Sequence, residues 1–560
     1  MEPNTAETRV PRDIAGYPFD LIVVGAGING AGIARDAAMR GLKVLLLDKG
    51  DIANGTTSWS TRLIHGGLRY LEYYEFHLVW ESLSEREKLL RIAPHLVKPL
   101  PFIVPIYESS KRGPTLVGLG MFMYDALSPS KSMNRHKMLS REEVMERAPG
   151  LNTEGLVGAA LYYDGQVEYA ERLAVENAVS AHEHGAVVIT YAEAEKVLVE
   201  DGDVVGVEFV DVLSGTRHEA RAPVTVNVAG PWVDQVLNRM RLGEGRMIGG
   251  TKGSHLIVDP FPGAPETAMY VEARRDGRPY FIVPWNGRYL IGTTDIRYKG
   301  DVDLVVADDK EIDYLIEETN SVIPEANLTR NEVLFTYSGV RPLSYQPEGS
   351  TSAVTRSHVV YDHAKEEPKI GGLISIVGGK LTTYRNLSRQ TVDRVYKKLG
   401  RQAPRSRTAE VPLPGGETRD FASFATDFKL TSGLTDDLAE RFLKLYGTRA
   451  PDVLAEAGDD HSLRVPLAAT FTPETGIIGA EVLYAFRREL AATLRDVLLR
   501  RTMVGMGPRV GLDVDRAAAR IAVQHLGWSG ERSEREIAEF REYVRRYKPK
   551  DLRELQPAGT

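Results

Sequence analysis

Three glycines and one aspartate lie at the spacing that lets a backbone turn approach a diphosphate. Gly25, Gly27 and Gly30 follow a short apolar run that is rich in β-branched residues. In such a turn the first glycine permits the tight bend, the second leaves room for a pyrophosphate, and the third packs helix against strand. Asp48 follows a second apolar run, residues 44–47, at the distance expected for a carboxylate that accepts a ribose hydroxyl. The pattern predicts a bound dinucleotide rather than a purely structural glycine turn, and the acid disfavours NADP.

The elements around this turn indicate which dinucleotide is bound. Residues 49–58 form a loop rich in glycine and hydroxyl groups, which suits contact with a flat ring system and its phosphates. Residues 224–230 read as another buried strand, and Pro231 after it can open a helix. Between them we expect an antiparallel meander. Its strands are residues 197–199, 204–210 and 216–220. A meander that interrupts a doubly wound sheet is typical of flavoproteins rather than nicotinamide enzymes.

Five polar blocks then follow one another along the chain. They are IHGGLRYLEYYEF (64–76), TKGSH (251–255), IGTTD (291–295), YSGVRPL (337–343) and GGKLTTYR (378–385). In type and order they resemble the FAD-dependent, quinone-linked (aerobic) glycerol-3-phosphate dehydrogenase family, over about residues 19–507. The resemblance implies an α/β fold with a D-amino-acid-oxidase-like (Rossmann-type) FAD-binding domain, an antiparallel-sheet substrate domain and a C-terminal all-α cap domain.

The same resemblance implies an activity in glycerol and glycerophospholipid metabolism. Such an enzyme oxidises sn-glycerol 3-phosphate to dihydroxyacetone phosphate by hydride transfer to FAD and passes the electrons to a membrane quinone. One alternative is a glycerol-3-phosphate oxidase that uses oxygen and forms hydrogen peroxide, although the chain lacks an obvious long insertion of those oxidases. An FAD-dependent amine or amino-acid oxidase would share the same fold, and so would a non-catalytic nucleotide-binding module.

The fingerprint, the loop after it and the resemblance together predict the FAD contacts. They are Gly25, Ala26, Gly27, Ile28, Asn29, Gly30, Asp48, Lys49, Thr57, Ser58, Ser60, Thr61, Leu63, His65, Val197, Ala229, Gly230, Trp232, Gly378, Gly379, Lys380, Leu381 and Thr382. The chain has no cysteine, which excludes disulfides, thiolate clusters and a flavin bonded through sulfur. We therefore expect non-covalent FAD, no metal site, and electrons that pass directly from flavin to a diffusing acceptor.

Oxidation of a secondary alcohol requires a group that removes the hydroxyl proton while hydride leaves. His65 and His255 both lie in blocks that carry the resemblance, and the pKa of an unperturbed histidine is near neutrality. Either could be the general base, and either could be a structural histidine. Lys380 ends an apolar run at a glycine pair before an expected helix, where anionic atoms are favoured. We expect it to stabilise the negative charge of reduced flavin.

A phosphorylated substrate requires cations, and arginine suits phosphate because of its bidentate geometry. The resemblance implies substrate or flavin contacts for four further residues. They are Arg69, Tyr70, Arg341 and Arg356. Which arginine binds phosphate stays open. Asp295 is expected to orient a neighbour such as Arg297 rather than to act directly.

Composition limits the remaining classes of function. The 560 residues exceed one ordinary core, so two or three domains are expected. Seventy basic and 77 acidic residues give a net charge of −7, which argues against nucleic acid as a partner. The expected substrate and product are glycerol 3-phosphate and dihydroxyacetone phosphate, and a homodimer is possible.

We expect a discontinuous domain organisation. The expected parts are a disordered leader (1–16), an FAD-binding domain (17–93, 165–249 and 337–400), a substrate domain (94–164 and 250–336), a linker (401–417), a helical domain (418–550) and a tail (551–560). In the helical domain the apolar spacing predicts four helices. They are residues 436–446, 480–501, 513–526 and 534–546. The charged face of residues 480–501 is expected to be solvated.

Two apolar segments are candidates for contact with a membrane. Residues 99–107 and 116–127 flank the basic pair at 111–112, a combination that suits an interfacial helix. The alternative is that both segments are core. The sequence shows no signal peptide and no run of about 20 apolar residues. We therefore expect a peripheral protein on the cytoplasmic face of the cell membrane, or a cytoplasmic one.

Overall fold

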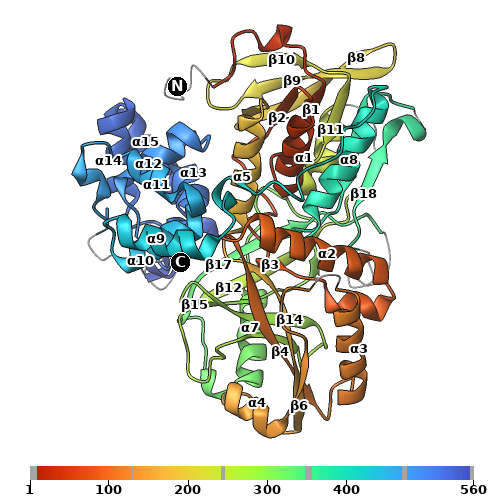
Figure 1. Cartoon of the computed structure of the whole chain (residues 1–560), viewed down its shortest axis with the longest axis vertical. Coiled ribbons are helices and arrows are strands. Elements are labelled where there is room, and N and C mark those ends of the chain that lie inside the picture. The colour runs from red at the N-terminus through yellow and green to blue at the C-terminus, as the bar shows by residue number, and fades with distance from the viewer. Residues whose placement is uncertain are drawn as a thin grey trace.

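The computed structural model describes residues 9–128, 131–240, 246–346, 356–367, 369–468 and 476–554. Figure 1 shows an α/β domain and a second sheet domain stacked along the long axis, with the C-terminal helices packed against their side. The chain passes between the two sheet domains several times, so each is built from separate segments.

The α/β domain is a mixed sheet in the order β18-β19-β11-β1-β2-β7. Its strands are β1 (Leu21–Val24), β2 (Val44–Leu47), β7 (Val187–Ile189), β11 (Val224–Asn227), β18 (Val359–Asp362) and β19 (Leu373–Val377). The strands run parallel except β18, which pairs antiparallel with β19. The apolar runs of β1, β2, β11 and β19 are buried throughout, as parallel strands covered on both faces require, whereas the edge strands β7 and β18 are partly exposed.

Helices and an antiparallel meander cover the two faces of this sheet. The helices are α1 (Ile28–Met39), α5 (Ala170–Glu183) and α8 (Tyr384–Lys398), and α1 packs against both others. The meander consists of β8 (Ala192–Glu200), β9 (Asp203–Asp211) and β10 (Arg217–Arg221). The expected meander is therefore confirmed, with its first strand beginning five residues earlier than predicted.

The second domain is a sheet in the order β16-β12-β15-β14-β13-β4-β6-β3, with β17 on β12 and β5 on β6. Its strands are β3 (Leu63–Ile64), β4 (Val97–Tyr107), β5 (Lys137–Ser140), β6 (Leu156–Val167), β12 (Thr251–Val258), β13 (Ala268–Glu272), β14 (Pro279–Trp285), β15 (Arg288–Gly292), β16 (Ile296–Arg297) and β17 (Val333–Arg341). Within the described residues β4 and β13 pair parallel, and the other neighbours pair antiparallel.

The border that we expected between residues 336 and 337 falls inside strand β17. β17 pairs with β12 from Val333 to Arg341, so residues 337–341, which we expected in the FAD-binding domain, belong to the second sheet. Helices α2 (Phe76–Ile92), α3 (Pro114–Ala126), α4 (Arg141–Arg147) and α7 (Asp309–Val322) accompany this sheet. Of the two apolar segments, residues 99–107 lie within β4, whereas residues 116–127 form most of α3.

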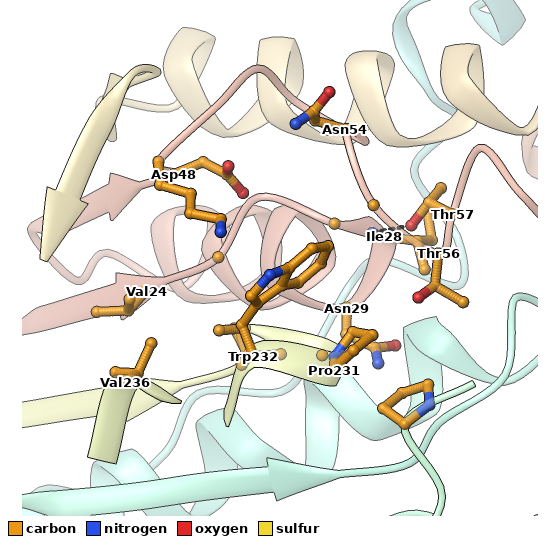
Figure 2. A pocket seen from close by; sticks show the side chains of 18 of the residues that line it. Val24, Ile28, Asn29, Asp48, Asn54, Thr56, Thr57, Pro231, Trp232 and Val236 are labelled. Carbon is orange, nitrogen blue, oxygen red and sulfur yellow. Dashed lines mark hydrogen bonds between the residues drawn. The ribbon is translucent and has the colours of Figure 1, made fainter. Parts of the chain in front are cut away.

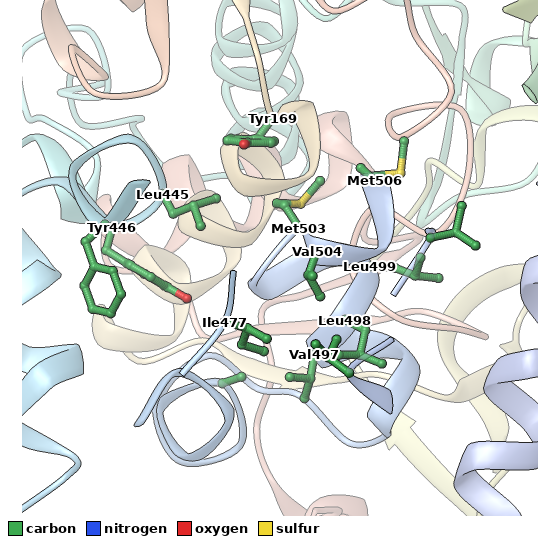
Figure 3. Packing of buried hydrophobic residues seen from close by; sticks show 14 of the residues in the cluster. Tyr169, Leu445, Tyr446, Ile477, Val497, Leu498, Leu499, Met503, Val504 and Met506 are labelled. Carbon is green, nitrogen blue, oxygen red and sulfur yellow. The ribbon is translucent and has the colours of Figure 1, made fainter. Parts of the chain in front are cut away.

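The C-terminal domain is helical. It contains α9 (Phe421–Thr431), α10 (Asp436–Tyr446), α11 (Ala450–Ala455), α12 (Gly479–Arg488), α13 (Leu494–Asp496), α14 (Asp515–Leu526), α15 (Gly530–Val544) and α16 (Lys550–Glu554). Figure 3 shows buried apolar side chains of this domain, and Tyr169 of the α/β domain lies near Met503. The cap therefore packs directly on the residue that precedes α5.

The prediction of one helix over residues 480–501 is wrong. Helix α12 ends at Arg488, and Leu490 adopts a left-handed conformation with φ of +60°. A new helix begins with the capping box of Thr493 and Asp496, and it continues into the π-helical turn η10 (Val497–Arg501). The prediction of a solvated charged face holds only for Arg487 and Arg488, which are exposed, whereas five other charged side chains of this segment are buried in ion pairs. These buried residues are Glu481, Glu489, Asp496, Arg500 and Arg501.

Candidate active site

A cavity opens at the carboxyl ends of β1, β2 and β11, beside the glycine turn (Figure 2). Ligands of doubly wound sheets bind at this edge. Gly27 is the residue before α1, and a Cβ placed on it would meet only Thr57 Oγ1, at 3.4 Å. At Gly30, by contrast, a Cβ would lie 1.7 Å from the carbonyl oxygen of Gly25. The second glycine therefore leaves space on the cavity side, and the third permits close packing of α1 on the turn.

Polar groups surround the N-terminus of α1. The backbone N–H of Ile28 donates to Thr57 Oγ1 at 3.0 Å. Asn29 Nδ2 donates to the carbonyl of Gly378 at 3.4 Å, while its buried Oδ1 has no hydrogen-bond partner. An orphaned buried acceptor on a cavity wall is a group that a ligand with hydroxyls or N–H groups can satisfy. The N-terminus of α1 favours anionic atoms at the same place.

Asp48 lies on the cavity wall at the end of β2. Its carboxylate accepts the backbone N–H of Ala26 at 2.6 Å and that of Gly50 at 2.8 Å. Burial raises the pKa of Asp48, although these two hydrogen bonds oppose the shift. The Nζ atom of Lys49 lies 4.7 Å from the centre of the Trp232 ring. Figure 2 shows this ring at the opening of the cavity. An acid, a helix N-terminus and an aromatic wall around a glycine backbone fit FAD.

Most predicted FAD contacts line this cavity. Those that do so are Gly25, Gly27, Ile28, Asn29, Asp48, Lys49, Thr57, Ser60, Ala229, Gly230, Trp232, Gly378, Gly379, Lys380 and Leu381. Ala26, Gly30 and Ser58 support the wall from behind, and Ser58 Oγ donates to the carbonyl of Ala53 at 2.6 Å. Val197 is not among the residues that line the cavity, and its side chain packs against apolar residues of the meander and its neighbours.

The sequence did not reveal several other residues of the cavity wall. They are Asn54, Gly55, Thr56, Pro231, Gln235, Val236, Arg239 and the start of β8 at Ala192, Glu193 and Ala194. An earlier start for the first meander strand would have found the last three. The remainder lie in a loop and a short helix, whose side-chain directions depend on tertiary packing.

A second, smaller cavity shares Thr56, Ser60, Lys380 and Leu381 with the first. It brings together five candidate catalytic residues from four segments of the chain. These residues are His65, Tyr70, His255, Arg341 and Lys380. Predicted flavin contacts Thr61, Leu63 and Thr382 line it as well. The cavity at the glycine turn thus adjoins a smaller pocket that is lined by two histidines, a lysine and two arginines.

The two histidines differ in their surroundings. His255 is 1% exposed, its Nε2 lies 2.9 Å from Thr61 Oγ1, and its ring centre lies 4.7 Å from that of Tyr337. Burial lowers the pKa of His255 well below its usual value, with Arg341 and Arg62 adding to the shift. His65 is less enclosed, and Thr382 Oγ1 accepts its backbone N–H at 3.1 Å. Burial also lowers the pKa of His65, and Lys380 contributes to the shift while Asp164 opposes it.

Asp295 joins two of the candidate arginines. Its Oδ1 lies 3.1 Å from Arg341 Nη1 and its Oδ2 lies 3.5 Å from Arg356 Nη2. Burial alone would raise the pKa of Asp295, but the two arginines hold it below the usual value. The neighbours that Asp295 contacts are therefore Arg341 and Arg356, whereas Arg297, which we named as an example, donates to the carbonyl of Gln346 at 2.9 Å.

Arg341 and Arg356 remain able to bind an anion. Arg341 also donates from Nη2 to Thr293 Oγ1 at 3.0 Å, while the buried Nη1 of Arg356 has no hydrogen-bond partner. Arg69, in contrast, is not among the residues that line the pocket. Its Nη2 donates to the Tyr73 hydroxyl at 3.3 Å. Of the three predicted arginines, Arg341 and Arg356 thus meet at Asp295, and Arg69 lies apart from them.

The comparisons with known proteins agree with this geometry. Residues 20–385 match the model of the family described as FAD dependent oxidoreductase, and residues 406–533 match the C-terminal domain of alpha-glycerophosphate oxidase. The fold and the site therefore define an FAD-dependent oxidoreductase, and the chain belongs to that family. The expected fold class and the FAD cofactor are confirmed.

Individual relatives narrow the assignment. A glycerol-3-phosphate dehydrogenase of Synechocystis sp. is 46% identical, covering 95% of this chain and 97% of the relative. A D-erythritol 1-phosphate dehydrogenase of Brucella abortus is 41% identical over 86% of this chain and 94% of the relative. The FAD complex of glycerol-3-phosphate dehydrogenase from Bacillus halodurans covers both chains completely, with a TM-score of 0.78 and 27% identity. The chain belongs to the FAD-dependent glycerol-3-phosphate dehydrogenase family.

Proposed function

We propose that this chain oxidises sn-glycerol 3-phosphate to dihydroxyacetone phosphate. The observation that carries the proposal is the arginine pair at Asp295, which lies beside a pocket that contains His65 and adjoins the FAD-shaped cavity. Bound FAD supplies the redox chemistry by accepting a hydride from the substrate carbon. The protein supplies the binding and the proton transfer.

Each group has a distinct role in this proposal. Arg341 and Arg356 bind the phosphate, and the unpartnered Nη1 of Arg356 gives it a donor that Asp295 does not use. His65 takes the proton of the substrate hydroxyl at a ring nitrogen, because its lowered pKa keeps it neutral at physiological pH. Lys380 places a cation between the two cavities. His255 orients Thr61 and the pocket wall.

The substrate is tested by anaerobic bleaching of the bound flavin. Rapid bleaching by glycerol 3-phosphate, but not by glycerol or glycine, would support the proposal. The Brucella abortus relative favours D-erythritol 1-phosphate as a second candidate at 41% identity. Preferential bleaching by that compound would redirect the assignment to a longer polyol phosphate, and bleaching by amino acids would redirect it to the oxidases of this fold.

For the electron acceptor we propose a quinone at a membrane surface rather than oxygen. Helix α3 carries Leu116, Leu119 and Phe122, which are 56%, 56% and 63% exposed. The exposed Tyr74, in the turn before α2, lines a cavity together with Leu116 and Leu119. Exposed apolar side chains on a short helix suit an interfacial position in a bilayer. No helix of the described residues is both long and apolar enough to cross a membrane.

The acceptor proposal has two tests. Reduced enzyme should be reoxidised by a short-chain quinone at least about tenfold faster than by oxygen, a difference of about 1.4 kcal/mol in barrier. The double variant Leu119→Glu, Phe122→Glu should lose sedimentation with anionic phospholipid vesicles. Leu430→Glu on α9 is the matched control, since Leu430 is 80% exposed on the helical domain. Fast oxygen-driven reoxidation with stoichiometric peroxide, or vesicle binding by the double variant, would contradict the proposal.

A further inference from the structure

A buried carboxylate in the FAD loop is bound by the C-terminal domain. Asp51, three residues after Asp48, is fully buried and accepts hydrogen bonds from Arg501 Nη1 and Nη2 at 2.8 and 2.7 Å and from Arg500 Nε. Both arginines are also buried, and both come from the π-helical turn η10. These ion pairs connect segments that lie about 450 residues apart in the chain.

The same network also contacts the start of the FAD loop, at Gly50, through Tyr191. Arg500 Nη2 lies 2.9 Å from Asp496 Oδ1, and the Tyr191 hydroxyl donates to that oxygen at 2.6 Å. The backbone N–H of Tyr191 in turn donates to the carbonyl of Gly50 at 2.8 Å. A ring of contacts therefore runs from the loop through Tyr191 and Asp496 to Arg500 and back to Asp51.

The tip of the loop meets the C-terminal domain as well. The Tyr543 hydroxyl of α15 donates to Asn54 Oδ1 at 3.3 Å. From Asn54 onward, the loop supplies Asn54, Gly55, Thr56 and Thr57 to the wall of the cavity at the glycine turn (Figure 2). A Cβ on Gly55 would lie 2.8 Å from the Trp232 ring, so the loop is pressed against the opposite wall. A small displacement of the loop would change the width of the cavity.

Burying three charges is a costly way to hold two domains together, because apolar packing of equal volume stabilises at least as well. The cost is consistent with a role in geometry, since a bidentate arginine fixes both the position and the orientation of its carboxylate. We propose that Arg500 and Arg501, acting through Asp51, are positioning residues that hold the FAD-binding loop. In consequence, FAD affinity depends on the docked C-terminal domain, and FAD binding stabilises that docking reciprocally.

The test compares FAD dissociation constants, measured by quenching of flavin fluorescence on binding to apoprotein. Asp51→Asn keeps the side-chain shape and removes the charge, and it should weaken FAD binding at least about tenfold, within the range usual for coupled sites. Glu481→Gln is the matched control, because Glu481 is equally buried in the C-terminal domain and pairs with Arg441 instead of the loop. The control should lower the melting temperature and leave FAD affinity within about twofold.

Milder variants keep the proposal testable if Asp51→Asn does not fold. Arg501→Lys should bind FAD more tightly than Arg501→Gln, because the lysine retains the charge. Tyr543→Phe should weaken binding about threefold through Asn54. Adding FAD to the wild-type chain should slow amide hydrogen exchange over residues 494–501, and this effect should be absent in Tyr543→Phe combined with Arg501→Gln. Unchanged FAD affinity in Asp51→Asn and Arg501→Gln, or an equal loss of affinity in Glu481→Gln, would overturn the proposal.

Discussion

The ammonium of Lys380 lies 3.8 Å from the centre of the Tyr70 ring, in a cation–π contact at the junction of the two cavities. Gly67 makes the contact possible, because a Cβ there would lie 2.0 Å from the Tyr70 ring and the residue has φ of +78°. Burial lowers the pKa of Lys380 to about 7, while Glu81 and Glu75 oppose the shift. The charge at this junction therefore changes near neutral pH.

The lowered pKa predicts a pH-dependent stability. Below about pH 7 Lys380 is charged in both states, and its burial penalty is complete. Between about pH 7 and the ordinary lysine value near 10.4, the unfolded chain binds more protons, so the contribution of Lys380 to unfolding free energy rises with pH. The flavin-free wild type should gain about 2–3 kcal/mol relative to Lys380→Met between pH 6.5 and 9. Urea unfolding of both proteins at both pH values measures this gain. An equal difference in unfolding free energy between wild type and Lys380→Met at pH 6.5 and pH 9 would refute the prediction.

Removal of Arg341 should impair recognition of phosphate more than chemistry. Arg341→Gln should reduce kcat/KM for glycerol 3-phosphate by a factor that corresponds to about 2–5 kcal/mol, with a much smaller loss on glycerol. Arg69→Gln is the control, because Arg69 contacts Tyr73 instead of lining the pocket. Steady-state kinetics give kcat/KM on both substrates. An equal fold loss of kcat/KM on glycerol 3-phosphate and on glycerol would show that Arg341 does not bind phosphate.

Asp295 should limit the affinity of the arginine pair for anions. Asp295→Asn keeps an acceptor for Arg341 and removes the negative charge that both arginines now face. Because the charges of Arg341 and Arg356 are then no longer neutralised by Asp295, a phosphate should bind about fivefold more tightly, a gain of about 1 kcal/mol in binding free energy. Competitive inhibition by inorganic phosphate measures the change. A larger inhibition constant in the variant, that is, weaker binding of phosphate, would mean that Asp295 chiefly orients the arginines.

The sequence predicted best what depends on local pattern. The glycine turn, the meander and the helix at Asp436–Tyr446 follow from backbone conformation and apolar periodicity, which nearby residues determine. It failed at residues 480–501 because Leu490 adopts a positive φ that only tertiary contacts explain. The partner of Asp295 was missed for the same reason, since Arg341 and Arg356 reach it from distant segments.

His65 and His255 can be separated by their pH profiles. His65→Gln should lower kcat about 10²- to 10⁴-fold, as expected for loss of a general base. In the wild type kcat/KM should fall as pH decreases through a value below 6.5, since the pKa of His65 is lowered. His255→Asn should retain that limb and lose activity mainly by disturbing Thr61. Loss of the limb in His255→Asn, with its retention in His65→Gln, would exchange the two roles.

Gly27 and Gly30 should respond differently to an added side chain. Gly27→Leu should abolish FAD binding in a folded protein, because the new side chain enters the cavity and its Cβ meets only Thr57 Oγ1 at 3.4 Å. Gly30→Ala should instead destabilise the chain by several kcal/mol, since its Cβ would lie 1.7 Å from the Gly25 carbonyl oxygen. Circular dichroism melting reports the fold, and flavin absorbance after gel filtration reports the cofactor. A stoichiometric yellow Gly27→Leu protein would show that FAD binds elsewhere, because no pyrophosphate could share the turn with leucine.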